Sequence, residues 1–84
     1  MNENEALQVY IRSRKKDYYK GPAYSITSKN DKGVFDILPY HANFITLINE
    51  TIVIDQDKKS QQKIEIKSGV LSVASNRVDV YLDL

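Results

Sequence analysis

The feature that most constrains the fold of this chain is an alternation of apolar and polar residues with a period of two. It recurs in three stretches, at residues 7–12, 63–67 and 78–83. Successive side chains of a β-strand point to opposite faces, so each stretch predicts a strand with one buried and one solvated face. The apolar members that we expect to face a core are Leu7, Val9, Ile11, Ile64, Ile66, Val78, Val80 and Leu82.

Short turn signals separate these stretches from further apolar runs. They are Gly21-Pro22, the polar segment 29–33, the charged segment 55–62 and the dipeptide Ser75-Asn76. Many short strands with regular turns predict an all-β fold, a small antiparallel β-sandwich of two sheets with roughly 8–10 short strands. The expected strands are 6–14, 17–20, 23–28, 34–38, 44–48, 51–55, 62–67, 70–74 and 77–82. The last two should form a closing hairpin that buries Leu71, Val73, Val78 and Val80.

Composition narrows the chemistry that this chain can support. Its 84 residues fit one domain, spanning 1–84, and they include no cysteine and a single histidine, His41. Disulfides and thiolate metal sites are therefore excluded, and one histidine cannot build a histidine metal cluster. The formal net charge of +1 gives no strong overall field for nucleic acid or an anionic membrane. We predict no cofactor and no metal site.

No catalytic motif is present in the sequence. There is no glycine-rich phosphate loop, nucleophile elbow or paired-histidine motif, and Asp79 and Asp83 are interpreted as a solvated strand edge. The prediction is a protein that is not an enzyme. The polar start 1–5 differs from a signal peptide, and the apolar run 51–54 is far shorter than the ~20 residues of a membrane span. We expect a location in the cytoplasm or on a cytosol-facing membrane surface, without direct insertion.

The basic run from Arg12 to Lys16, followed by Tyr18 and Tyr19, has two interpretations. Cations can follow phosphates while bases stack on aromatic rings, which would make a nucleic-acid surface. Alternatively, charges at the end of a strand protect a sheet edge against aggregation. We favour the second interpretation because the rest of the chain is nearly neutral, and we predict no nucleic-acid partner.

The segment 33–48 resembles a known family. It reads like the stretch G-x-(L/F)-G-(I/V)-(L/Y)-P-G-H-A-P-L-(L/I)-T-x-(I/L) of the epsilon subunit of F-type ATP synthases, called delta in mitochondria. Four further segments resemble motifs of the same family. Segment 50–54 resembles P-G-x-(V/I)-x-(I/V), segment 67–73 resembles S-G-G-x-L-x-V, and segment 76–83 resembles (G/N)-x-V-T-V-L-A-D. Tyr19-Lys20-Gly21 resembles the family's aromatic-x-G. The register of the resemblance holds from about residue 7 to residue 83.

This resemblance implies both a fold and a role. The family's amino-terminal domain is a β-sandwich at the foot of the central stalk, where it clamps the gamma subunit and rests on the membrane c-ring without an active site of its own. By this resemblance the partners would be the gamma subunit and the c-ring of a rotary ATPase. A lower contact loop would contain Lys32, Gly33, Val34, Pro39, Tyr40, His41 and Asn43, and Thr46 would lie near the gamma subunit.

Several positions depart from the family pattern. Tyr40 and Asn43 replace the Gly and the second Pro of Pro-Gly-His-Ala-Pro, and Asp36 replaces a second Gly. These changes fall mostly in the contact loop, so we expect an altered partner surface on an unchanged sandwich. Members of the family usually continue, after the position of Leu84, into a helical hairpin that restrains the motor and in some bacteria binds ATP. We therefore assign no autoinhibitory or ATP-sensing role to residues 1–84. The alternative function is a free-standing adaptor with the same fold and a different protein partner.

Overall fold

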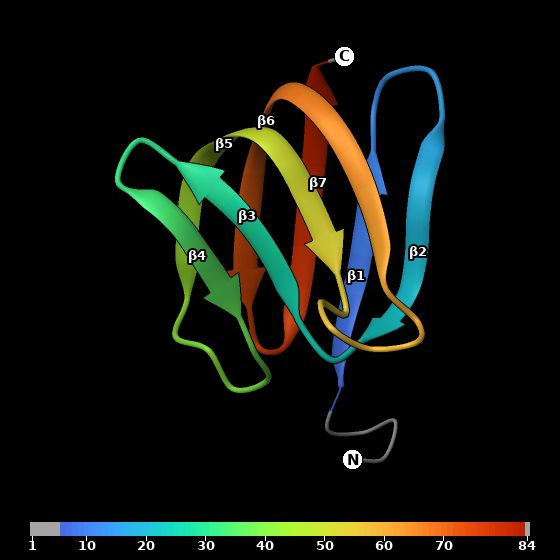
Figure 1. The fold of residues 1–84 in the computed structure, drawn as a ribbon. Coiled ribbons are helices and arrows are strands. Elements are labelled where there is room, and N and C mark those ends of the chain that lie inside the picture. The colour runs from blue at the N-terminus through green and yellow to red at the C-terminus, as the bar shows by residue number, and fades with distance from the viewer. Residues whose placement is uncertain (1–5, 84) are drawn as a thin grey trace.

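The computed structural model describes residues 6–83, and in that range the regular elements are strands (Figure 1). The polar start 1–5 lies outside the described residues. No helix among the described residues could cross a membrane. The all-β prediction is confirmed. The strands are β1 (Leu7–Arg12), β2 (Asp17–Ala23), β3 (Ile26–Asn30), β4 (Gly33–Ile37), β5 (Phe44–Ile54), β6 (Gln62–Ala74) and β7 (Arg77–Asp83).

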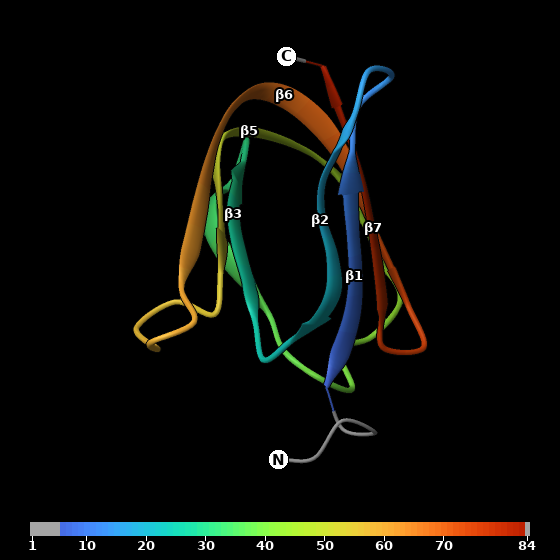
Figure 2. The ribbon, with the colours of Figure 1, turned by 90° about the vertical axis from the view of Figure 1, so that its right-hand side faces the viewer.

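All seven strands belong to one hydrogen-bonded sheet in the order β2-β1-β7-β6-β5-β3-β4. Neighbours are antiparallel except for β1 and β7, which are parallel. The sheet folds back on itself because β5 and β6 arch over one end, and Figure 2 shows the two resulting layers from the side. The back layer holds β1, β7 and adjoining halves of β5 and β6, and the front layer holds β3, β4 and the other halves. The predicted sandwich is confirmed, with layers that share two strands.

The shared strands explain why the structure has seven strands where the sequence predicted about nine. The predicted pairs 44–48 with 51–55, and 62–67 with 70–74, are each one long bent strand. In β5 the register shifts between Asn49 and Glu50, and Glu50 has a φ of 70°. In β6, a Cβ on Gly69 would lie 2.7 Å from the Tyr81 carbonyl oxygen, so the close approach of β6 to β7 needs glycine. A bulge bends a strand without ending its pairing, and a local pattern cannot distinguish that bend from a turn.

The boundaries of the first hairpin also differ from the prediction. Strand β1 ends at Arg12 rather than at residue 14, because Ser13 N donates to Lys16 O at 2.9 Å and closes a turn. Strand β2 runs through Gly21-Pro22, which the sequence had suggested as its end, and continues to Ala23. Proline is tolerated there because β2 is an edge strand, where a residue without an N–H need not break a central ladder.

The core lies between the two layers and follows the predicted alternation. Leu7, Val9 and Ile11 are buried, and so are the four residues of the closing hairpin, Leu71, Val73, Val78 and Val80. Ile64 is half-buried and packs against the edge of this core. Ser75 and Asn76 make the tight hairpin turn between β6 and β7 with φ values of 49° and 61°. Two left-handed residues match the twist of a two-residue hairpin, so this predicted reversal is confirmed.

Candidate functional site

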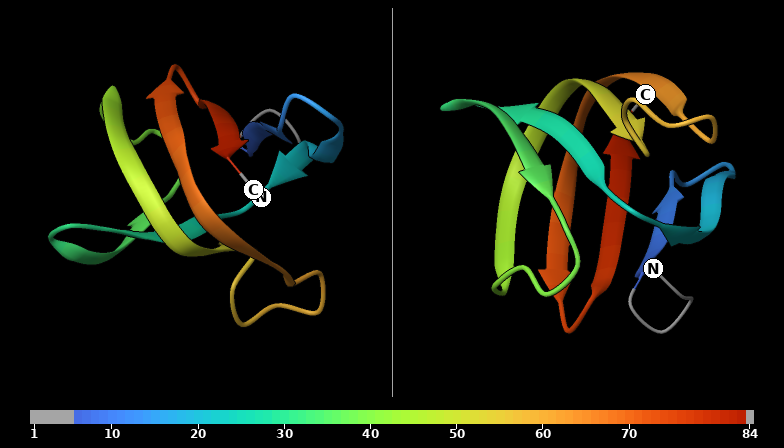
Figure 3. Two further views of the ribbon diagram at one scale, coloured as in Figure 1. Left: turned by 90° about the horizontal axis from the view of Figure 1, so that it is seen from above. Right: turned by 60° about the horizontal axis from the view of Figure 1, so that its bottom comes forward.

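The structure separates the predicted contact residues into two groups at opposite ends of β4. Lys32 and Gly33 lie at the β3–β4 turn, in the upper left of Figure 1. The segment 39–43 belongs to the β4–β5 loop at the lower end, which comes forward in the right panel of Figure 3. Five residues of strand span about 16 Å, so the two groups do not form the single contact loop that the sequence suggested. We call residues 38–43 the lower loop.

The lower loop is fixed to the neighbouring hairpin turn through its backbone. Tyr40 N donates to Asn76 Oδ1 at 2.5 Å, and His41 N donates to Leu38 O at 3.2 Å. Tyr40 has a φ of 67°, a left-handed conformation that is uncommon for a residue with a bulky side chain. Its side chain is 75% exposed. The loop therefore holds a large amphipathic ring in solvent on a fixed backbone.

The side chain of His41 contacts two neighbours in and beside the loop. Its Nδ1 lies 2.6 Å from the carbonyl oxygen of Ala42, and this contact assigns the proton to Nδ1 because a carbonyl can only accept. Its ring centroid lies 5.7 Å from that of Phe44, which in turn packs edge-on at 5.7 Å from Phe35. This aromatic row connects the lower loop with the core. Asn43 is exposed and Pro39 is half-buried at the start of the same loop.

In the upper group Lys32 and Val34 are exposed, and Thr46 of β5 lies beside this group through its bond to Asn30. Val34 lies on the edge strand β4 and is 74% exposed. Thr46, which the resemblance suggested would lie near the gamma subunit, is half-buried. Its Oγ1 accepts from Asn30 Nδ2 at 3.2 Å and donates to Leu47 O at 3.1 Å. Lys32 N donates to Asn30 Oδ1 at 2.9 Å, so Asn30 connects the turn to β5.

Sequence reasoning missed a surface on the back layer, which we call the outer face. Its apolar part consists of exposed side chains on β5, β6 and β7, and the register places Leu47, Val70 and Tyr81 side by side on successive strands. The neighbouring row begins at Ile45. The available signal was the presence of aromatic residues at solvent-facing positions of the alternation, Tyr10 and Tyr81.

The polar part of the outer face is built around Arg12. Its guanidinium carbon lies 4.1 Å from the ring centroid of Tyr10 and 4.1 Å from that of Tyr81, and its Nη1 contacts Asp79 Oδ1 at 3.0 Å. Desolvation, the largest single influence, lowers the pKa of Arg12, but the interactions with Asp79 and Tyr81 raise it overall. Arg77 Nε also contacts Asp79, at 3.3 Å. Asp79 is therefore part of an ion cluster, not the solvated edge that the sequence suggested.

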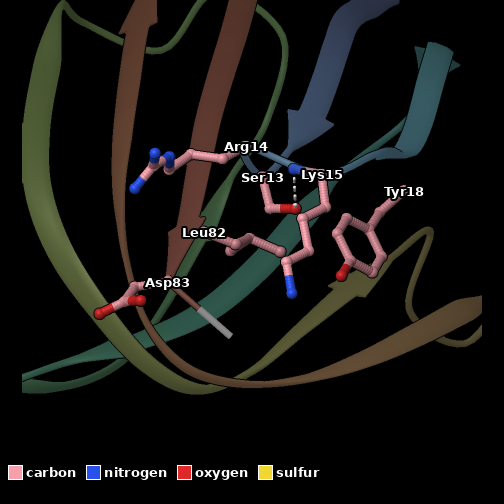
Figure 4. Close-up of a pocket in the computed structure, with 6 residues that line it drawn as sticks. All are labelled: Ser13, Arg14, Lys15, Tyr18, Leu82 and Asp83. Atoms are coloured by element: carbon pink, nitrogen blue, oxygen red, sulfur yellow. Dashed lines mark hydrogen bonds between the residues drawn. The ribbon is translucent and has the colours of Figure 1, made fainter.

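Two of the remaining basic residues of the predicted cluster, Arg14 and Lys15, line a hollow of about 680 Å³ at the β1–β2 turn (Figure 4). Ser13 Oγ accepts from the backbone N–H groups of Lys15 and Lys16 at 3.2 and 3.4 Å. Lys16 Nζ lies 4.5 Å from the ring centroid of Tyr18, and Asp83 contributes a carboxylate to the hollow. Because Arg12 turns to the outer face, the cluster does not form one continuous basic surface. This arrangement is that of a charged hairpin turn.

The buried carboxylate of Asp55 has a structural role. Its Oδ1 accepts from Tyr24 N at 2.6 Å and from Ser25 N at 3.3 Å, and its Oδ2 accepts from Ser60 Oγ at 2.7 Å. These bonds join the β5–β6 loop to the segment between β2 and β3. Among residues 6–83, no group of three or more His, Asp or Glu side chains is arranged to hold a metal ion.

The family of this chain is shown by a match along almost its whole length. The model of the ATP synthase delta/epsilon chain β-sandwich domain matches residues 6–83. The chain belongs to this family. The ATP synthase epsilon chain of Sulfurimonas denitrificans is 32% identical over 66 residues, which cover 77% of this chain and 51% of that protein. The epsilon chain of Helicobacter pylori strain P12 is 27% identical over 77 residues, covering 92% of this chain and 63% of that protein.

Solved structures show the same fold. A chain of the Euglena gracilis mitochondrial ATP synthase, in a structure of its OSCP, F1 and c-ring, superposes with a TM-score of 0.83 at 14% identity. The match covers 98% of this chain and 53% of that chain. A chain of the Tetrahymena thermophila mitochondrial ATP synthase central stalk and c-ring gives a TM-score of 0.73 at 17% identity, covering 90% and 62%. The chain thus spans between half and two thirds of these relatives.

The resemblance to the delta/epsilon family bears on the backbone conformation of Tyr40. By the sequence resemblance Tyr40 takes the place of a glycine, and it adopts the left-handed φ that glycine reaches without strain. The bond from Tyr40 N to Asn76 helps to hold this conformation in place.

Proposed function

We propose that this domain is a non-catalytic subunit of the central stalk, or rotor, of an F-type rotary ATPase. It would link the gamma subunit to the membrane c-ring during proton-coupled ATP synthesis or hydrolysis, as a peripheral component on the cytoplasmic face of the membrane. The observation that carries this proposal is the placement of the two contact groups at opposite ends of one continuous sheet. A link between two partners needs two separate contacts on a body that does not shear.

The sheet supplies that stiffness. Each strand is hydrogen-bonded to its neighbours, and β5 and β6 carry their pairing through the bend from one layer to the other. A relative displacement of the two ends would have to break ladder bonds along 11 residues of β5 and 13 of β6. Buried backbone groups are costly to leave unpaired, so the two ends move together. The domain can therefore transmit torque without chemistry of its own.

We assign one contact group to each partner. The lower loop, with Pro39, Tyr40, His41 and Asn43, would dock on the gamma subunit. The upper turn, with Lys32, Gly33 and the exposed Val34, would face the c-ring. Thr46, which was expected near the gamma subunit, bonds to Asn30 beside the upper turn, so it would support the contact of that turn instead of the lower loop. Tyrosine anchors at an interface often cost 2 kcal/mol or more when truncated.

Co-purification from the native cell tests the proposal. A tagged wild-type chain should retain the gamma subunit and the ring, and the double variant Tyr40→Ala with His41→Ala should lose most of the gamma subunit. The matched control is Lys63→Ala with Glu65→Ala, two exposed positions on β6 of the front layer. Circular dichroism melting should show all variants folded, since an unfolded sandwich would lose partners for an uninformative reason.

Two outcomes would contradict different parts of the proposal. If the folded double variant retains the gamma subunit at the wild-type level, the lower loop is not the contact. If the wild-type chain retains no rotary-ATPase subunit, the stalk function itself is wrong and the adaptor alternative is favoured.

A further inference from the structure

The two edge strands of the sheet differ in how they are protected against further pairing. An edge strand presents unpaired N–H and C=O groups that another strand can bind, and lysine or proline at the edge opposes this. Strand β2, at one edge, carries Lys20 and Pro22. Strand β4, at the other edge, reads Gly-Val-Phe-Asp-Ile and contains neither residue type. Among residues 6–83, β3 is the only strand paired with β4, so the outer side of β4 is open (Figure 1).

The register with β3 determines which backbone groups of β4 are free. Hydrogen-bonded and non-hydrogen-bonded pairs alternate along an antiparallel ladder. Asn30 and Gly33 close the two-residue turn between the strands, and such a closing pair is hydrogen-bonded. By the alternation, Phe35 also bonds to β3. Val34 and Asp36 therefore direct their N–H and C=O groups to the open side.

Local hydrogen bonds limit this open ladder at both ends. At the upper end, Lys32 N donates to the asparagine side chain of the same turn at 2.9 Å. At the lower end, Leu38 O accepts from His41 N at 3.2 Å. The open ladder of β4 is therefore made of four groups, the N–H and C=O of Val34 and those of Asp36.

These four groups complement the same groups of a second copy in one antiparallel register. With Phe35 opposite Phe35 of the second copy, Val34 of each chain lies opposite Asp36 of the other. A two-fold axis at Phe35 then makes two hydrogen-bonded pairs, with four bonds in total. The two half-buried Phe35 rings would meet at the axis, and aromatic cross-strand pairs stabilise sheets.

The two neighbouring registers fit less well. With the axis at Val34, Asp36 lies opposite Lys32, whose N–H is already bonded within its own turn. With the axis at Asp36, two carboxylates lie directly opposite each other, which is destabilising. Asp36 accepts from Thr27 Oγ1 and forms none of the ion pairs found among residues 6–83, so its charge is not neutralised there.

We propose that β4 pairs with β4 of a second copy about a two-fold axis at Phe35, which gives a dimer with one continuous sheet. Val34 is 74% exposed in the single chain, and the pairing covers part of its side chain. The pairing rests on β4 alone. If the proposed function holds, the dimer excludes the ring contact of the upper turn, because both use Val34, and only this consequence rests on the proposed function.

Sedimentation of the purified chain tests the pairing without any stalk subunit, so its outcome is separate from that of the proposed function. Wild type should shift from monomer to dimer as its concentration rises to about 1 mM. Val34→Asp places a carboxylate opposite Asp36 in both pairs and should weaken the dimer about tenfold. Val34→Lys places a cation there and should strengthen the dimer by about as much. High salt should reduce both effects.

The matched control applies the same two substitutions to Leu47. Its side chain is 72% exposed, but it lies on β5, which is paired on both sides. Leu47→Asp and Leu47→Lys should sediment as wild type. Amide exchange supplies a second measurement on wild type. Exchange at Val34 and Asp36 should slow as the concentration rises, and exchange at Phe35, which is already bonded to β3, should not.

Three results would overturn the proposal. The first is a chain that stays monomeric at about 1 mM. The second is a dimer that both charges at residue 34 weaken equally, because Asp36 would then not lie opposite that residue. The third is a dimer that Leu47→Asp dissociates and Val34→Asp does not, because the second copy would then cover the outer face.

Discussion

The lower loop and the outer face each present an exposed tyrosine, but they hold it by different means. In the lower loop, Tyr40 is placed by a left-handed backbone and a hydrogen bond to Asn76. On the outer face, Tyr81 is placed by an ordinary strand and by stacking with Arg12. The loop depends on one strained conformation, whereas the outer face depends on the register of several strands. Local changes should therefore disturb the loop alone, and changes in the core should disturb the outer face.

The largest effect is expected for a change beneath the outer face. Val80 is fully buried, and on β7 it lies opposite Leu71 of β6 and Ile11 of β1. Val80→Ala should lower the free energy of unfolding by roughly 1–3 kcal/mol, through lost burial and a residual cavity. Urea denaturation measures this change. If the free energy of unfolding does not change within experimental error, the core closes around the shortened side chain, and the outer face does not depend on Val80.

A smaller effect is expected from releasing the lower loop. Asn76→Gly removes the acceptor for Tyr40 N while keeping a residue that tolerates a φ of 61°. The lost hydrogen bond should lower the free energy of unfolding by about 1 kcal/mol. Amide exchange at Tyr40 should become faster, and exchange at Tyr81 should not. Equal acceleration at both tyrosines would show that the two regions are not independent.

Relaxing the loop backbone should change stability still less. Tyr40→Gly places glycine in a left-handed conformation, which relieves strain of roughly 1 kcal/mol but adds freedom to the unfolded chain. The two contributions oppose each other, so the melting temperature should stay within a few degrees of wild type. Gamma-subunit binding should nevertheless fall, because the exposed ring is lost. Wild-type binding would show that the loop contributes backbone shape and not its tyrosine.

The smallest effect concerns alkaline pH and belongs to the outer face. The hydrogen bond from Tyr10 to Asp17 raises the pKa of Tyr10, because it favours the neutral phenol beside a carboxylate. A group with a raised pKa gives stability that is complete below its unfolded pKa of about 10 and is lost as the pH rises through the folded value. Tyr10→Phe should therefore reduce the loss of stability above about pH 10, as measured by melting. Asp17→Ala should act in the same direction, and an unchanged profile in both would contradict the prediction.

Much of the fold could be predicted because its determinants are local. The alternation at 7–12 and 78–83 places each apolar side chain on the buried face, since the period of a strand is fixed by its backbone. Ser75 and Asn76 predict a reversal because the turn is closed within four residues. The segment 39–43 lies in one loop for the same reason, and its role as a contact stays a prediction. It is one contiguous segment, so its residues form a motif that can be recognised in the sequence.

The tertiary structure alone decided where the candidate contacts lie in space. Lys32 and Tyr40 are eight positions apart in the sequence, yet β4 separates them to opposite ends. Arg12, Tyr81 and Leu47 belong to three strands that are distant in sequence, and they become neighbours only through the register of β1, β7, β6 and β5. The sequence by itself determined which face of each strand is apolar, because that pattern follows from the backbone of a single strand. Which strands pair, and in what register, was decided by packing both layers around one core, where a shift of one residue would turn buried side chains to solvent.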